Sequence, residues 1–159
     1  ELTFLLDRIR QQNNDLKNTL FHQGIVADYY LKKSMIFAAE TLTDQEFKLY
    51  GRIYSELTGN MPQPDLCIFL HQTPQQLLKN IAKRGRTYES NISEEYLTKI
   101  QKSYFRFLKQ IDNFPILIID CTNIDFVSNH NLLKWLLKLP TQKWKNGYNI
   151  LTPNESESV

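Results

Sequence analysis

Long apolar runs, clustered glycines and a strong net charge are all missing from this sequence. No apolar run is long enough to span a bilayer and no signal peptide is visible, so we expect no membrane partner. The five glycines are far apart, which excludes a glycine-rich phosphate loop within the 159 residues. The net charge of +2 is too small to indicate binding to nucleic acid or to a membrane surface.

Cysteine is also scarce, and no metal-binding pattern is present. Cys67 and Cys121 lie in or beside apolar runs, where a free thiol behaves as a small core residue. We therefore expect two reduced thiols and a cytoplasmic location rather than a disulfide. The histidines have no short ligand spacing with each other or with the cysteines, so we expect them to be structural or exposed. They are His22, His71 and His130.

Hydrophobic spacing predicts short apolar strands that alternate with helices. Strands are expected at 24–28, 65–71 and 115–120. Helices are expected at 2–9, ending in the polar stretch 11–15, and at 32–42, 44–57, 74–84, 94–108 and 132–137. This order indicates an α/β fold with a parallel sheet covered by helices on both faces.

Several helix ends carry recognisable signals. The segments TDQE at 43–46 and TPQQ at 73–76 predict capping boxes, the second with proline at the first helical position. Ser93 predicts a further N-cap. Polar residues also stand at the carboxyl ends of the three predicted strands, where parallel sheets bind ligands. These residues are Asp28, His71 and Asp120.

The stretch KRGRTYESNISEEYL, residues 83–97, crowds basic side chains around one glycine. Basic residues in the last turn of a helix stabilise its macrodipole, and Gly85 suits the position just after a helix, so a structural role explains the charge. Alternatively, Arg84 and Arg86 in a hinge can close over phosphate groups with forked hydrogen bonds. Spacing alone leaves both interpretations open.

This stretch resembles the lid of the deoxynucleoside kinases, whose pattern is roughly R-G-R-x-x-E-x-x-I-x-x-x-Y-L. The matching residues are Arg84, Gly85, Arg86, Glu89, Ile92, Tyr96 and Leu97. The similarity extends over nearly the whole chain: PDLCIFLHQTPQQLL resembles the strand and helix before the lid. LLDRIR resembles the nucleoside-binding helix, and ILIIDCTNIDF the last strand and adenine loop.

The resemblance implies a P-loop NTPase-like kinase fold, with a parallel sheet flanked by helices. It implies ATP-dependent phosphorylation of a deoxynucleoside at its 5′-hydroxyl, in nucleotide salvage, with Mg²⁺ bridging the phosphates. It also implies a homodimer through the helices that include 2–9 and 47–57. In some bacteria this kinase is joined to a pterin pyrophosphokinase, which would then be part of a longer chain.

The family's phosphate loop and general-base glutamate have no counterpart in this sequence, which opens with Glu1 inside a helical pattern. We therefore expect the C-terminal part of a kinase that is inactive by itself. Residues 1–151 would form a partial kinase domain, with the N-terminal strand, loop and helix missing and the lid at about 83–92. Residues 152–159 would form a flexible tail.

By resemblance, Arg84 and Arg86 are the lid arginines that act in catalysis and contact the ATP phosphates. They would neutralise the charge that develops on the transferred phosphoryl group. Glu89 resembles the glutamate that accepts a hydrogen bond from the sugar 3′-hydroxyl. Without the lid pattern, a solvated loop acid is the better interpretation of Glu89.

Other roles follow by resemblance at single positions. Asp125 and Phe126 resemble an Asp-Phe pair that holds the ATP adenine, with core packing as the alternative for Phe126. Arg8 resembles an arginine that reaches the substrate base, and a surface charge is its alternative. Glu1 stands where the family usually has a glutamine that pairs with the base, and a carboxylate cannot donate as that amide does.

Two positions depart from the family pattern. The acid-Arg-Ser motif becomes DYY, in which Asp28 keeps the acid that helps to hold Mg²⁺ and Tyr29 replaces the arginine that organises the catalytic base. Asn80 stands where relatives often place an arginine over the adenine. Two other functions remain open: a nucleoside monophosphate kinase of the thymidylate type, and a non-catalytic nucleotide sensor or dimerisation module.

Overall fold

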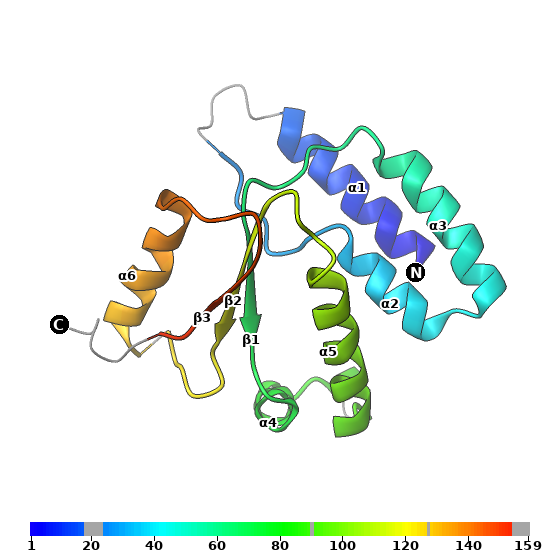
Figure 1. Ribbon diagram of the computed structural model, residues 1–159. Coiled ribbons are helices and arrows are strands. Elements are labelled where there is room, and N and C mark those ends of the chain that lie inside the picture. The colour runs from blue at the N-terminus through cyan, green and yellow to red at the C-terminus, as the bar shows by residue number, and fades with distance from the viewer. Residues whose placement is uncertain (18–23, 90, 127, 154–159) are drawn as a thin grey trace. The chain divides into compact units, whose positions relative to one another are not determined.

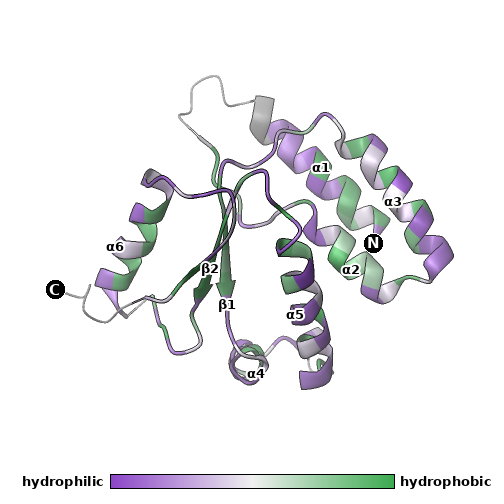
Figure 2. Ribbon diagram, in the orientation of Figure 1, coloured by the Kyte–Doolittle hydropathy of each residue, from purple (hydrophilic) through white to green (hydrophobic). Residues whose placement is uncertain are grey.

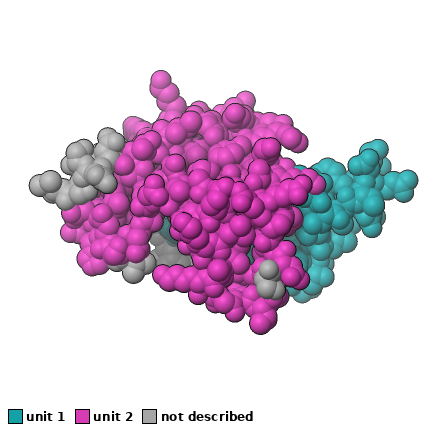
Figure 3. All heavy atoms as spheres, turned by 90° about the horizontal axis from the view of Figure 1, so that it is seen from below, with its two compact units in different colours: residues 1–63 teal, residues 64–159 magenta. Residues whose placement is uncertain are grey.

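The computed structural model describes residues 1–17, 24–89, 91–126 and 128–153 (Figure 1). The chain divides into two compact units, Glu1–Gln63 and Pro64–Val159, which Figure 3 colours separately. In the described part of the chain, no helix is both long enough and apolar enough to cross a membrane. His22 and most of the predicted tail, residues 154–159, lie outside the described residues.

In its described residues, 1–17 and 24–63, the first unit contains three helices: α1 (Leu2–Lys17), α2 (Lys33–Thr41) and α3 (Asp44–Thr58). Its buried core contains Leu5, Ile9, Leu31, Ala38 and Tyr50. The helix α1 continues through the polar stretch at 11–15, where we expected it to end, and is described as far as Lys17. The apolar face at helical spacing therefore predicts the start of α1 but not its length.

The prediction of a strand at 24–28 is wrong. These residues form no strand, Val26 is fully exposed, and Ile25 is 46% exposed. An apolar, β-branched run favours a strand only when neighbouring strands pair with it and bury it. Asp28 consequently does not stand at the end of a strand.

The second unit contains a parallel sheet of three strands in the order β1-β2-β3. The strands are β1 (Cys67–His71), β2 (Pro115–Asp120) and β3 (Gly147–Leu151). The central strand β2 is the most deeply buried, as its continuous apolar sequence predicts. The strand β3 was not predicted, because its five residues include the polar Asn149 and show no clear periodicity.

Helices cover both faces of this sheet (Figure 1), which confirms the predicted α/β class. On one face, Phe69 of β1 contacts Tyr104 and Phe105 of α5 (Glu94–Leu108), at 5.3 and 5.8 Å between ring centroids. On the other, Leu117 and Ile119 pack with side chains of α6 (His130–Lys138) and of the short 3-10 helix η3 (Leu139–Thr141). Figure 2 shows the apolar colouring of β1 and β2 between these helices.

The predicted caps are largely present. Thr43 and Glu46 form the complete capping box of α3, and Ser93 accepts from the Tyr96 amide to cap α5. Thr73 caps α4 (Pro74–Arg84) by accepting from the Gln76 amide. The Gln76 side chain does not complete that box; it donates to Asn80 within the helix.

Candidate functional site

The helix α4 ends in a sharp hinge that presents the lid residues. Gly85 has a φ of 66°, in the left-handed region that favours glycine, and its amide donates to Ile81 O at 3.2 Å. The 3-10 helix η2 (Thr87–Glu89) follows. The Glu89 amide donates to Arg86 O at 3.0 Å, so the hinge turns tightly and brings Glu89 back toward the arginines.

One carboxylate joins the two lid arginines. Glu89 Oε1 lies 3.3 Å from Arg84 Nη1 and 3.4 Å from Arg86 Nη1. The Glu89 side chain is only 12% exposed, whereas those of Arg84 and Arg86 are 48% and 51% exposed. Arg86 also donates to the Tyr88 hydroxyl at 3.1 Å. Tyr88 first and Glu89 second raise the pKa of Arg86, which keeps the guanidinium charged.

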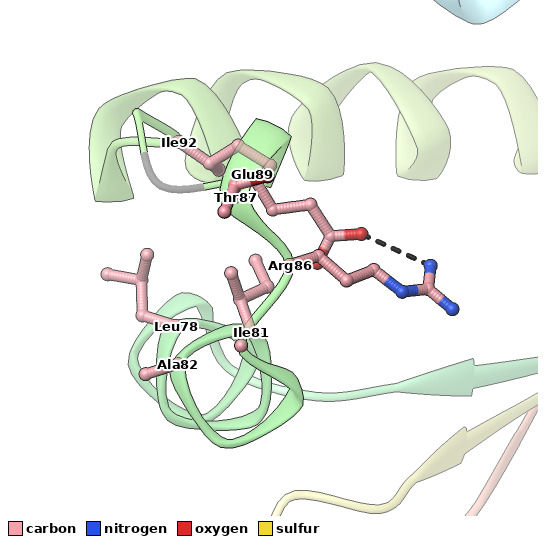
Figure 4. Close-up of a pocket in the computed structure, with 8 residues that line it drawn as sticks. Leu78, Ile81, Ala82, Arg86, Thr87, Glu89 and Ile92 are labelled. Atoms are coloured by element: carbon pink, nitrogen blue, oxygen red, sulfur yellow. Dashed lines mark hydrogen bonds and ion pairs between the residues drawn. The ribbon is translucent and has the colours of Figure 1, made fainter.

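A pocket of about 600 Å³ opens beneath the hinge (Figure 4). Its apolar wall comes mainly from α4, and its polar rim comes from the hinge and η2. The lining residues are Leu78, Ile81, Ala82, Gly85, Arg86, Thr87, Glu89 and Ile92. Figure 4 shows the Arg86 guanidinium extending away from the apolar wall, with the Glu89 carboxylate beside it.

The second carboxylate oxygen of Glu89, Oε2, is buried and has no hydrogen-bond partner among the described residues. A buried acceptor without a partner is unfavourable in the free protein, by about 1–3 kcal/mol. A hydroxyl group of a ligand in the pocket would supply the missing donor. The other oxygen of the same carboxylate, Oε1, contacts both arginines.

At the carboxyl ends of the strands, two of the predicted residues lie together. His71 and Asp120 are register partners of β1 and β2, and His71 Nδ1 lies 3.5 Å from Asp120 Oδ1. Asp120 Oδ1 also accepts from the Thr122 hydroxyl at 2.6 Å and from its amide at 3.0 Å. These Thr122 bonds, and then His71, lower the pKa of Asp120. Asp28 belongs to the first unit, whereas His71 and Asp120 belong to the second.

The loop after β2 carries the two residues expected at an adenine ring. Asp125 is exposed, and its Oδ1 accepts from the Ser128 amide at 3.4 Å. Phe126 is half-buried and packs against the cluster that contains Leu117 and Cys121. The packing of Phe126 agrees with the core alternative and leaves one part of its side chain accessible.

In the first unit, Arg8 and Tyr29 form a pair that the sequence did not predict. The Arg8 guanidinium lies 4.4 Å from the centre of the Tyr29 ring, and the Tyr29 hydroxyl donates to Arg8 O at 3.3 Å. Lys33 is a further charge here that sequence reasoning missed. Partial desolvation and Arg8 lower its pKa, while Asp28 raises it, which indicates that these charges interact.

Two predicted residues of the first unit, Glu1 and Asp28, have exposed side chains. Glu1 precedes α1, is exposed, and accepts from the Leu5 amide through its carbonyl at 3.0 Å. Within the described ranges, no group of three or more His, Cys, Asp or Glu side chains could hold a metal ion. Mg²⁺ usually takes only one or two protein carboxylates together with substrate phosphates, so the exposed carboxylate of Asp28 fits such a role.

Sequence reasoning also missed an amide network that joins the ends of β1 and β2 to the helices α4 and α5. Gln72 contacts Asn80, Gln101 and the carbonyl of Cys121 through hydrogen bonds. The glutamine-rich segment 72–76 was the only available signal, and it does not identify partners up to 49 residues away.

Comparisons with known proteins agree on one family. The family model described as deoxynucleoside kinase matches residues 1–139. Deoxyguanosine kinase of Bacillus subtilis is 33% identical over 138 residues, which cover 81% of this chain and 65% of that protein. Deoxyadenosine kinase of Lactobacillus acidophilus is 28% identical over 160 residues, covering 93% of this chain and 74% of the relative. Deoxycytidine kinase of Bos taurus is 28% identical over 152 residues, which cover 80% of this chain and 57% of that relative.

The chain thus spans between about half and three quarters of the length of these relatives. The family match covers the lid, the sheet strands β1 and β2, and all three helices of the first unit. Because it extends over far more than half of the sequence, it identifies the family independently of any single motif. This chain belongs to the deoxynucleoside kinase family.

Proposed function

We propose that this chain carries the lid and base-binding parts of an ATP-dependent kinase that phosphorylates a deoxynucleoside at its 5′-hydroxyl. The observation that carries the proposal is the cluster of Arg84, Arg86 and Glu89 on the Gly85 hinge. Positive charge for phosphate oxygens and an acceptor for a hydroxyl stand there within one short segment. The same proposal includes a role in nucleotide salvage and a cytoplasmic location, and the family of the chain supports it.

Phosphoryl transfer depends chiefly on positioning and on charge neutralisation. Arg84 and Arg86 would contact the phosphates of ATP and stabilise the charge on the transferred group. Glu89 would accept the sugar 3′-hydroxyl through Oε2, the buried oxygen that has no partner among the described residues. Its other oxygen, Oε1, keeps its contacts with both arginines and so links sugar recognition to the lid.

The other roles rest on the family pattern and on accessible side chains. Asp125 and Phe126 would hold the adenine of ATP, for which the exposed carboxylate and the half-buried ring are suited. Arg8 and Glu1 would contact the substrate base. Asp28 would bind Mg²⁺, which supplies charge neutralisation to the phosphates.

The proposal extends to the assembly. Residues 1–151 would form part of a kinase domain followed by a tail, and the kinase would be a homodimer. Exposed apolar side chains on α1 and α3 support a dimer interface there, among them Phe4 at 71% and Leu49 at 57% exposed. Fusion to a pterin pyrophosphokinase is part of the same proposal and rests on the family resemblance alone.

The test is an assay of the complete enzyme, meaning residues 1–159 with any residues that its gene encodes on either side. Purine and pyrimidine deoxynucleosides and their monophosphates are offered as acceptors with radiolabelled ATP and Mg²⁺. We expect label on the 5′-oxygen of a deoxynucleoside. Label only on monophosphates would favour the thymidylate type of kinase, and no label on any acceptor would favour a non-catalytic role.

A further inference from the structure

Gln72, the first residue after β1, makes hydrogen bonds to three different elements. Its side-chain Nε2 donates to Cys121 O at 3.2 Å, and its Oε1 accepts from Asn80 Nδ2 at 2.8 Å. Its backbone carbonyl accepts from Gln101 Nε2 at 2.8 Å. Gln72, Asn80 and Gln101 are half-buried and Cys121 is buried, so these bonds are partly shielded from water.

The direction of this amide network is determined by its end point. A carbonyl such as Cys121 O only accepts, so Gln72 must present its NH₂ group to it and its oxygen to Asn80. Asn80 must therefore donate to Gln72, and its own oxygen accepts from Gln76 Nε2 at 3.2 Å. The bonds run in one direction, from Gln76 through Asn80 and Gln72 to Cys121, and such a chain polarises each of its members.

The partners of Gln72 belong to the elements that carry the proposed ATP-binding residues. Asn80 lies on α4, one helical turn before Arg84. Gln101 lies on α5, the helix that follows the lid. Cys121 begins the loop that leads to Asp125 and Phe126. One residue therefore contacts both helices that flank the lid and the loop expected at the adenine.

We propose that Gln72 is a positioning residue that holds this loop in register with α4 and α5, and so orients the ATP adenine and phosphates together. The proposal rests on the proposed function in one respect, the assignment of the loop and lid to ATP. The hydrogen bonds themselves do not depend on it. Gln72 would act through Cys121 and Asn80 and would not touch ATP.

A second set of bonds joins β1 and the same loop without Gln72. The Cys121 amide donates to His71 O at 2.7 Å, and the Thr73 amide donates to Thr122 Oγ1 at 3.3 Å. The ends of the strands therefore stay joined when the Gln72 side chain is lost. Methionine has nearly the same length as glutamine, so we expect Gln72→Met to fold. What Gln72→Met removes is the connection from the loop to α4.

Hydrogen exchange of the 159-residue chain tests this connection without any assay of activity. In Gln72→Met, we expect exchange to accelerate by about tenfold at the Ile124 amide, which shares the Cys121 carbonyl, and in the last turn of α4. Amides of the central strand β2 should not change. The control is Gln110→Met, the same change at an exposed position just after α5. Uniform acceleration, or none, would overturn the positioning role.

Kinetics of the complete enzyme supply the second measurement. Gln72→Met should raise KM for ATP by about tenfold, the effect of one lost hydrogen bond to a binding element, and should change KM for the deoxynucleoside by less than about twofold. Asn80→Leu should reproduce the effect, and the double variant should add little, because both break one chain of bonds. Equal changes in both KM values would overturn the proposal. If the complete enzyme without any substitution has no activity, the proposed function is overturned instead. Hydrogen exchange would still decide the role of Gln72.

Discussion

Arg84 and Glu89 are joined across the Gly85 hinge, with 3.3 Å between Nη1 and Oε1. The same oxygen lies 3.4 Å from Arg86, so one carboxylate balances two guanidinium groups. One positive charge is left over, and it lies on side chains that are about half exposed. The lid therefore combines internal order with one uncompensated positive charge, which supports the proposed contacts with phosphate oxygens.

Replacing Arg86 tests the proposed catalytic role. In the complete enzyme, Arg86→Ala should lower kcat by roughly 10²–10³, the usual loss for one donor to a transition-state charge. KM for the deoxynucleoside should move much less. Steady-state kinetics and the melting temperature are measured together. Arg106→Ala, in the last turn of α5, is the control for loss of a basic residue at a helix end. An unchanged kcat with a lower melting temperature would leave only the helix-end role for Arg86.

Glu89 is tested with two substrates. Glu89→Ala should reduce kcat/KM about tenfold to a hundredfold for a 2′-deoxynucleoside, because a charge-assisted hydrogen bond to the 3′-hydroxyl is lost. A 2′,3′-dideoxynucleoside has no such hydroxyl and should lose little. Glu95→Ala, at an exposed acid in the first turn of α5, should leave both substrates unaffected. Equal losses on the two substrates would mean that Glu89 only supports the hinge.

The hinge glycine is tested by stability. Gly85→Ala places a Cβ on a backbone with a φ of 66°, and no atom beyond the adjoining residues lies within 4 Å of it, so the cost comes from the backbone conformation. We expect the free energy of unfolding to fall by about 1 kcal/mol. Gly24→Ala is the control, because its Cβ also has no neighbour within 4 Å and its φ is not positive. Denaturant titration should show the loss only for Gly85→Ala.

The strand-end carboxylate predicts a pH-dependent effect. The folded-state pKa of Asp120 is lowered by Thr122, so its stabilisation is present above the unfolded pKa of about 3.9 and is lost as pH falls through the folded value. Thr122→Val removes the hydroxyl that donates to Asp120. It should lower the melting temperature by about 2–4 °C at pH 7, and the difference should close toward pH 3.

The control for this pH effect is Thr141→Val. The Thr141 hydroxyl donates to the carbonyl of Lys138 at 2.8 Å, a bond that involves no titrating group. Its effect on the melting temperature should be the same at each pH. If the difference caused by Thr122→Val is also constant, the Asp120 carboxylate is not what Thr122 stabilises.

Sequence reasoning succeeded where the cause is local. The capping box at Thr43 and Glu46, the cap at Ser93 and the left-handed Gly85 depend on residues within one helical turn. The lid pattern also lies in one short segment, so the resemblance to the family, which the comparisons confirm, could be seen before any contact was known. The buried strands β1 and β2 were evident from unbroken apolar runs.

Sequence reasoning failed where a partner far away in the sequence determines the secondary structure. Residues 24–28 have the composition of a strand but adopt none, and Gly147–Leu151 became the strand β3 because Pro115–Ile119 pairs with it. A strand needs a neighbour to satisfy its backbone groups, and no local pattern reveals that neighbour.

The amino-acid sequence by itself determined the helix boundaries with caps, the hinge glycine and the charged residues of the lid. Only the tertiary structure decided that Glu89 Oε1 contacts both arginines, while Oε2 has no hydrogen-bond partner among the described residues. It also decided that Gln72 connects Asn80, Gln101 and Cys121. The reason is physical: backbone conformation follows from neighbouring residues, whereas burial and hydrogen-bond partners arise only when distant segments pack together.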